Sequence, residues 1–74
     1  MSEQDREVEK QYSNAENIRK LTRLVECMRE GKPYEIQVAG ERIYVPVSAA
    51  FSIEHERDGV DEELEFQFRW SNTD

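Results

Sequence analysis

The sequence has little of what metal sites, disulfides and nucleotide-binding loops require. Among its 74 residues there is one cysteine and one histidine, so an internal disulfide is impossible and a zinc site would lack ligands. Its three glycines stand isolated at positions 31, 40 and 59, which excludes the G-x-x-x-x-G-K and G-x-G-x-x-G phosphate loops. We therefore expect neither a metal nor a cofactor.

Long apolar runs are also missing. The longest stretch spans a few residues, far short of the roughly 20 that cross a bilayer. Residues 1–5 have neither the basic region nor the apolar region of a signal peptide. A single cysteine fits a reducing compartment. These features predict a cytoplasmic protein without a membrane partner.

Positive charge is scarce. The sequence contains 10 Lys and Arg and 17 Asp and Glu, which gives a formal net charge of −7. A chain of this length forms one domain at most. Its charge repels phosphate backbones, which argues against nucleic acid as a partner. The charge is uneven: residues 13–32 carry five basic and three acidic groups, net +2, whereas residues 33–74 carry three basic and ten acidic groups, net −7. We therefore expect a basic helix and an acidic sheet.

The clearest element is a helix over about residues 14–30. Ser13 and Glu16 form an S-x-x-E capping box. Gly31 is a natural C-terminal cap, and Pro33 prevents continuation. Between these ends the apolar residues recur at helical spacing and form one stripe, which consists of Ile18, Leu21, Leu24, Val25 and Met28.

From Tyr34 onward the apolar period changes from 3.6 to 2, which indicates strands. Two alternating segments flank Gly40-Glu41. A two-residue loop at that position pairs Val38 with Ile43 and Ile36 with Val45, and glycine at its first position suits a type II′ turn. The pattern therefore predicts a hairpin with one apolar face.

A second pair of alternating segments covers residues 51–57 and 63–70, with an Asp-Gly turn between them. Two registers keep the apolar faces consistent: one pairs Ile53 with Leu64, and the other pairs Ile53 with Phe66. The sequence leaves this choice open.

The predicted fold class is α+β. Residues 13–70 form a single domain in which one amphipathic helix packs on one face of a four-stranded antiparallel meander. Residues 1–12 form a polar segment, either partly ordered or with a short edge strand around residues 7–12, and residues 71–74 form a tail. So small a core leaves a thin stability margin, which favours a homo-oligomer. The expected core contains Ile18, Leu21, Leu24, Val25, Met28, Tyr34, Ile36, Val38, Ile43, Val45, Val47, Phe51, Ile53, Leu64, Phe66, Phe68 and Trp70.

The whole pattern resembles the amphi-Trp domain, a small prokaryotic module. The resemblance covers residues 6–70 and rests on the helix stripe, on the turn at Gly40 within "REGKPYEIQVAGERIYVPV", on the V-P-V at 45–47 and on the terminal Trp70. It implies a compact α+β domain and brings no established activity with it.

Catalytic residue patterns are weak. The single histidine, His55, has acidic neighbours Glu54 and Glu56, but in a strand these point to the opposite face. Glu54 shares a face with Glu56, and Glu63 shares one with Glu65, as the solvated side of an amphipathic sheet does. Nothing in the pattern supplies the shielded pocket that a tuned carboxylate pair needs. We predict that the protein is not an enzyme and has no small-molecule substrate.

An interaction surface is the better prediction. Tyr44 is the outward-facing aromatic residue of the sheet and lies between Arg42 and Pro46, and Tyr and Arg are enriched at interface hot spots. Trp70 either closes its own core or docks in a partner. We predict a non-catalytic protein-interaction or assembly module that self-associates or serves as an accessory subunit of a larger complex.

The alternative is a small nucleic-acid- or anion-binding regulator that uses the basic helix face. Its contacts would be Arg19, Lys20 and Arg23. The acidic sheet and the absence of an interleaved aromatic platform argue against this alternative.

Overall fold

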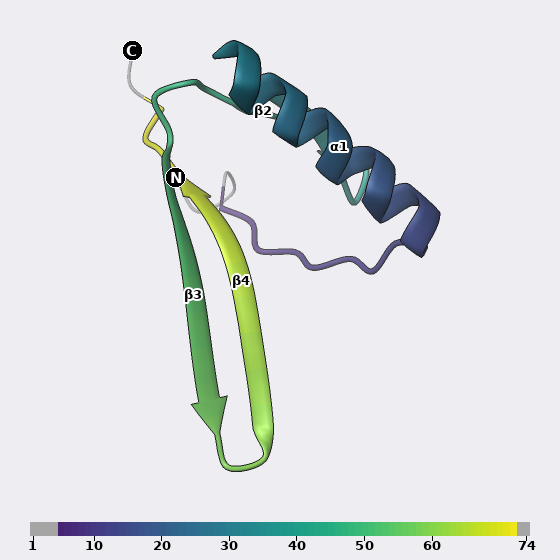
Figure 1. Ribbon diagram of the computed structural model, residues 1–74, viewed down its shortest axis with the longest axis vertical. Helices are drawn as coiled ribbons and strands as arrows, with labels where there is room; N and C mark the ends of the chain where they lie inside the picture. The colour runs from purple at the N-terminus through teal and green to yellow at the C-terminus, as the bar shows by residue number, and fades with distance from the viewer. Residues whose placement is uncertain (1–4, 73–74) are drawn as a thin grey trace.

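Within residues 5–72, which the computed structural model describes, the protein is an α+β chain with one helix and four strands. The predicted fold class is therefore confirmed at this level. The ends of the predicted N-terminal segment and of the predicted tail, residues 1–4 and 73–74, lie outside the described part. The elements are α1 (Asn14–Glu30), β1 (Tyr34–Val38), β2 (Glu41–Val45), β3 (Ala50–Asp58) and β4 (Asp61–Arg69). Figure 1 shows how the helix and the β3–β4 hairpin are arranged.

Helix α1 begins and ends where its capping residues predict. The Glu16 amide donates to the Ser13 hydroxyl at 3.2 Å, which satisfies one of the free N-terminal amides. At the other end Gly31 adopts the left-handed conformation with φ of 65°. The amides of Gly31 and Lys32 then donate to the carbonyls of Met28 and Cys27 at 3.3 and 2.9 Å, the pattern of a Schellman motif.

The β1–β2 hairpin forms with a register two residues away from the predicted one. Ile36 pairs with Ile43 rather than with Val45, so the predicted register was wrong. The turn falls at Ala39 and Gly40, whose φ values of 48° and 86° are both positive. A type I′ turn requires this at both central positions, and its twist suits a two-residue hairpin. Because the shift is even, each side chain keeps its predicted face.

The β3–β4 hairpin takes one of the two registers that the sequence left open, the one in which Ile53 is opposite Phe66. The ladder extends to the pair of Asp58 and Asp61, so the turn consists of Gly59-Val60. Gly59 has φ of 64°, which its missing Cβ permits at little cost.

The predicted four-stranded meander was wrong. Within residues 5–72 the strands form two separate two-stranded sheets, β1–β2 and β3–β4, and β2 does not pair with β3. Pro46 has no amide with which to extend the β2 ladder. The Ala49 amide donates to the Pro46 carbonyl at 3.1 Å, and this turn leads β3 away from β2 (Figure 1). We call residues 50–69 the arm, and α1 with the β1–β2 hairpin the base.

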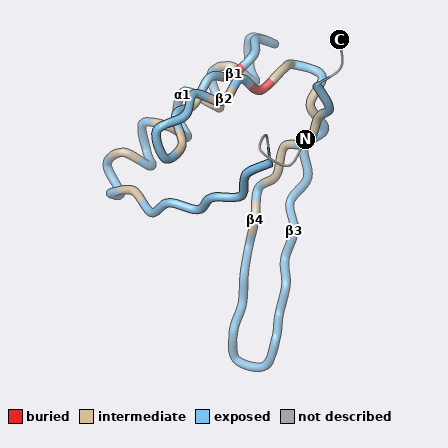
Figure 2. The backbone as a smooth tube through the Cα atoms, turned by 180° about the vertical axis from the view of Figure 1, so that it is seen from behind, coloured by how far each residue is buried: buried red, intermediate tan, exposed pale blue. Residues whose placement is uncertain are grey.

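Burial is confined to the base. Among the described residues only Tyr34 and Val45 are buried, at 6% and 7% exposure. Every residue of β3 is exposed, and Figure 2 shows that this exposure continues along nearly the whole arm. The predicted core of seventeen side chains was therefore wrong for a single chain, because the arm does not lie against the helix.

Residues 5–12 form no strand, so the structure lacks the edge strand that the sequence left open around residues 7–12. The segment runs beneath α1 (Figure 1) and is attached through two side chains. The Arg6 guanidinium donates to the Val38 carbonyl at 2.8 Å and pairs with Glu41 at 3.1 Å. The Tyr12 hydroxyl donates to the Gln37 carbonyl at 3.3 Å. The segment is thereby held against the β1–β2 turn by side chains rather than by a ladder.

Candidate interaction surfaces

The first candidate surface is one side of the arm, which we call the arm face: Phe51, Ile53, Leu64, Phe66 and Phe68. The register places these residues together, because cross-strand partners share a face. Ile53, Leu64 and Phe66 are 59%, 65% and 58% exposed. The aromatic rings contact one another, with the Phe51 centroid 4.9 Å from that of Phe68 and 6.2 Å from that of Phe66. The result is a preformed apolar ridge open to water.

The second candidate surface is the helix stripe, which we define as Ile18, Leu21, Val25 and Met28. These residues are between 46% and 56% exposed. The helix packs on β1 through a neighbouring side instead, where Leu24 and Cys27 are half-buried. There the Tyr34 hydroxyl donates to the Lys20 carbonyl at 2.8 Å. The stripe that the sequence assigned to the core therefore lies largely uncovered.

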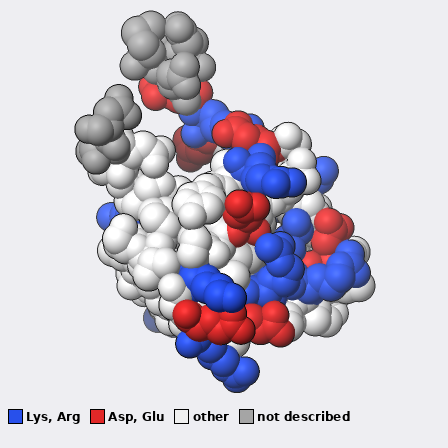
Figure 3. Space-filling view, turned by 90° about the horizontal axis from the view of Figure 1, so that it is seen from above, with Lys and Arg blue, Asp and Glu red and all other residues white. Residues whose placement is uncertain are grey.

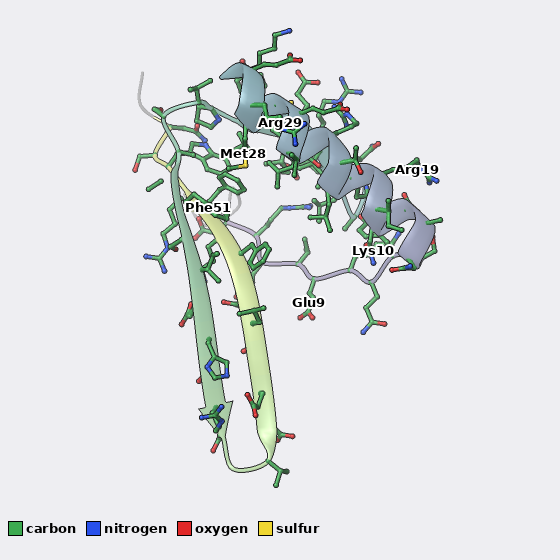
Figure 4. All side chains as sticks on the ribbon, viewed as in Figure 1. Glu9, Lys10, Arg19, Met28, Arg29 and Phe51 are labelled. Atoms are coloured by element: carbon green, nitrogen blue, oxygen red, sulfur yellow. The ribbon has the colours of Figure 1, made fainter. Side chains whose placement is uncertain are left out.

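A groove connects the two surfaces where the arm leaves the base. Met28 projects from α1 toward Phe51 at the start of the arm, as Figure 4 shows. The space between them is about 210 Å³ and mostly apolar, and its lining includes Leu24, Met28, Tyr34, Val45, Phe51 and Phe68. The arm face and the helix stripe thus approach each other at this hollow, through Phe51 and Phe68 of the arm face and Met28 of the stripe.

The opposite side of the arm is acidic. Glu54 pairs with Glu65 across the strands and Glu56 pairs with Glu63. Repulsion from Glu65 raises the pKa of Glu63, and loss of hydration and the charge of Glu56 raise it further. Gln67 donates to the carboxylates of Glu54 and Glu65 at 2.8 Å each and relieves part of the repulsion. This acidic face is a solvated surface and not a shielded acid–base pair.

His55 lies beside the arm face near the tip, and its partner is a residue that sequence reasoning missed. Its Nε2 is 2.8 Å from the Glu62 carboxylate, and Arg57 donates to the same oxygen at 3.3 Å. These hydrogen bonds lower the pKa of Glu62. The observed register pairs Arg57 with Glu62 and places His55 on the same face. The alternation of the two strands puts these three residues on one side in either register that the sequence left open, so that alternation could have identified the cluster.

The predicted interaction residues lie on two different parts of the molecule. Tyr44, 55% exposed, shares the outer face of the β1–β2 sheet with Arg42, which pairs with Glu35 at 3.6 Å. Trp70 is half-buried just after β4. Its indole N–H donates to the Asn72 side chain at 3.2 Å, which supplies the polar partner that a partly buried tryptophan needs.

The three residues predicted for anion binding also differ in their surroundings. Lys20 donates to the Gln37 carbonyl at 3.3 Å and lies 4.7 Å from the Tyr12 ring centre. Arg23 stacks 5.5 Å from the Tyr34 ring, whereas Arg19 points away from the base (Figure 4). Lys and Arg do gather over the α1 side of the molecule in Figure 3, interspersed with carboxylates. Two of the three predicted contacts therefore serve the packing of α1 on β1.

Comparison with known proteins finds no match to a family model, to a curated protein or to a solved structure. The resemblance to the amphi-Trp domain remains a prediction. Along residues 5–72 no helix is long and apolar enough to cross a membrane. The same residues contain no group of three or more side chains suited to hold a metal ion.

Proposed function

We propose that the protein is a non-catalytic assembly module that binds protein through the arm face and the helix stripe. The observation that carries this proposal is the exposure of the arm face, where Ile53, Leu64 and Phe66 are each more than half exposed. Contiguous apolar patches of this kind mark interaction sites in soluble proteins, because covering them removes apolar area from water.

The groove at the foot of the arm supports the same proposal. Interface hot spots cluster in apolar pockets at the centre of a patch, and this hollow lies between Met28 and Phe51, where the two surfaces meet. Tyr44 and Arg42 supply a separate polar-aromatic patch on the outer sheet face, and Trp70 lies at the end of the arm. We assign these three residues a secondary contribution to binding.

Sedimentation velocity combined with binding of the dye ANS tests the proposal. The wild-type chain should bind ANS when dilute, and the fluorescence per chain should fall as concentration rises and the apolar surface becomes covered. Ile53→Thr should reduce both dye binding and assembly, because threonine keeps strand propensity while removing apolar area. Ser52→Thr, on the opposite side of the same strand, is the matched control and should change neither. A dilute chain that remains monomeric and binds no ANS would contradict the proposal.

The anion-binding alternative receives less support from the geometry. Lys20 and Arg23 are committed to contacts within the base, and the acidic face of the arm repels a polyanion. Salt-dependent retention on a nucleic-acid matrix that disappears in the Arg19→Gln variant would favour this alternative over assembly.

A further inference from the structure

We infer that the protein which covers these surfaces is a second copy of the same chain, in a reciprocal dimer where each arm lies across the helix stripe of its partner. The inference rests on the proposed function and specifies its partner. Four observations carry it: the excess of exposed surface, the match of the two apolar surfaces, the sign of their charges and the direction of the arm.

The chain exposes more surface than a compact monomer of its mass does. The chain exposes 6701 Å², whereas a compact monomer of 8.8 kDa exposes about 4,800 Å². The uncovered side chains of the arm face and of the helix stripe contribute to this excess surface.

The two surfaces match in length. From the rung at Phe51 to the rung at His55 and Leu64 the arm face extends about 14 Å. From Ile18 to Met28 the helix stripe extends about 15 Å. One arm therefore covers one stripe, and the twofold exchange uses both surfaces of both chains and closes without further growth.

Charge favours contact between arm and helix over contact between two arms. Residues 50–69 carry seven carboxylates and two arginines, net −5, whereas residues 13–32 carry five basic and three acidic groups, net +2. Opposite signs attract and fix the pairing of surfaces. Two arms placed face to face would bring −5 against −5, and like charges in an interface disfavour that pairing.

The direction of the arm excludes self-coverage in this conformation. The turn at residues 46–49 sends β3 away from the base, so an arm reaches its own helix only at its foot, where Phe51 and Phe68 line the groove with Met28. The arm projects beyond the base (Figure 1). Ile53, Leu64 and Phe66 on the arm face are each more than half exposed, so a second chain is needed to cover them.

A mixing experiment with two double variants tests the exchange. The arm variant carries Ile53→Thr and Phe66→Thr, and the helix variant carries Leu21→Gln and Val25→Gln. All four positions are exposed in the single chain, and the new residues keep the local propensity without changing charge. Each variant alone should dimerise more than about a hundredfold more weakly than the wild type, because each exchange contact loses two large apolar side chains.

An equimolar mixture should associate at least about tenfold more tightly than either variant alone, because the intact arm of one chain then meets the intact stripe of the other. Sedimentation velocity measures the association, and circular dichroism confirms that both variants keep α1. No recovery in the mixture would overturn the exchange.

The remaining outcomes separate this inference from the proposed function. If the helix variant alone dimerises as the wild type does, the arms pair with each other. If the arm variant alone does so, the helices pair. In both cases the exchange is overturned while assembly through these surfaces stands. A wild-type chain that stays monomeric at high micromolar concentration overturns the exchange. If it also binds ANS, a different protein is the partner, and if it binds none, the proposed function fails as well.

Discussion

The hairpins of the base and of the arm have the same alternating sequence pattern, but one is partly buried and the other is exposed. Both hairpins alternate apolar and polar residues, and both have an apolar face. In the base that face meets α1, and Tyr34 and Val45 become buried. In the arm the face meets solvent, and every residue of β3 stays exposed. The alternation specifies which side of a strand is to be covered, and the turn at residues 46–49 determines that the chain does not cover the arm itself.

The largest expected contrast compares truncations at matched positions of the two hairpins. Val45→Ala should lower the free energy of unfolding of the dilute chain by about 2 kcal/mol, since it removes buried methyl groups and leaves a cavity. Ile53→Ala should leave that free energy nearly unchanged, because Ile53 is already 59% exposed. Urea unfolding followed by the helix circular dichroism measures both. Equal losses in the two variants would mean that the arm is covered within one chain.

A smaller contrast concerns the two tyrosines of the base. Tyr34→Phe should cost about 1 kcal/mol, because it removes the hydrogen bond to the Lys20 carbonyl. Tyr44→Phe, on the exposed face, is the control and should cost close to nothing.

The pH dependence of Tyr34 provides a second measurement on the same variants. Burial raises its pKa above the ordinary value of 10.0, against the lowering effect of the Arg23 charge. Because the pKa is raised, the neutral Tyr34 side chain stabilises the folded state. This contribution is complete below pH 10.0 and is lost as pH rises through the folded-state pKa. The alkaline loss of stability should therefore be weaker in Tyr34→Phe than in the wild type. An unchanged alkaline profile would contradict the assignment.

The two central positions of the β1–β2 turn allow a further contrast. Ala39 has φ of 48°, a conformation that costs residues with a Cβ about 1 kcal/mol and that asparagine tolerates better. Ala39→Asn should therefore stabilise the base by about 0.5 kcal/mol and raise its melting temperature. Gly40→Ala, at φ of 86°, should have the opposite effect. A melting temperature that does not rise in Ala39→Asn would show that the type I′ turn is not formed in solution.

The smallest effect is expected on the acidic face of the arm. Glu63 has a raised pKa, so it disfavours the folded hairpin as pH rises through and above its ordinary value of 4.5. Glu63→Gln should therefore increase the amide protection of the arm at neutral pH, and the difference from the wild type should vanish in acid. Glu62 has a lowered pKa, so its contribution is present above 4.5 and is lost as pH falls. Glu62→Gln should accordingly decrease protection at neutral pH. Hydrogen exchange measures both, and changes of the same sign would contradict the assignment.

These contrasts also show which parts of the structure the sequence could predict. The helix was predictable to the residue, because Ser13, Gly31 and the apolar period act within one or two turns of chain. The faces of both hairpins were predictable because the period of a strand is two. The registers were less so, since Gly40 and Gly59 each permit more than one two-residue turn, and an even shift leaves the pattern unchanged.

The position of the arm relative to the base could not be predicted from local sequence patterns. Whether β3 returns beside β2 depends on a turn whose sequence, "PVSA", has no distinctive residue apart from the proline. The candidate interaction surfaces were missed for the same reason. The sequence pattern predicted that Ile53, Phe66 and the helix stripe would be buried, and it placed them in the core of a single chain. The small core expected for a chain of this length, and the preference for an oligomer that follows from it, did point toward a partner.

Within the part of the chain that the structure describes, the β3–β4 sheet has two strands, so each strand of the arm has one edge without a partner strand. Such edges recruit further strands and can propagate into fibrils. Here the row formed by Glu54, Glu56, Glu63 and Glu65 would be stacked against its own copy in any in-register extension. Like charges placed directly opposite one another are destabilising, so this acidic row works against the edge-to-edge stacking of arms.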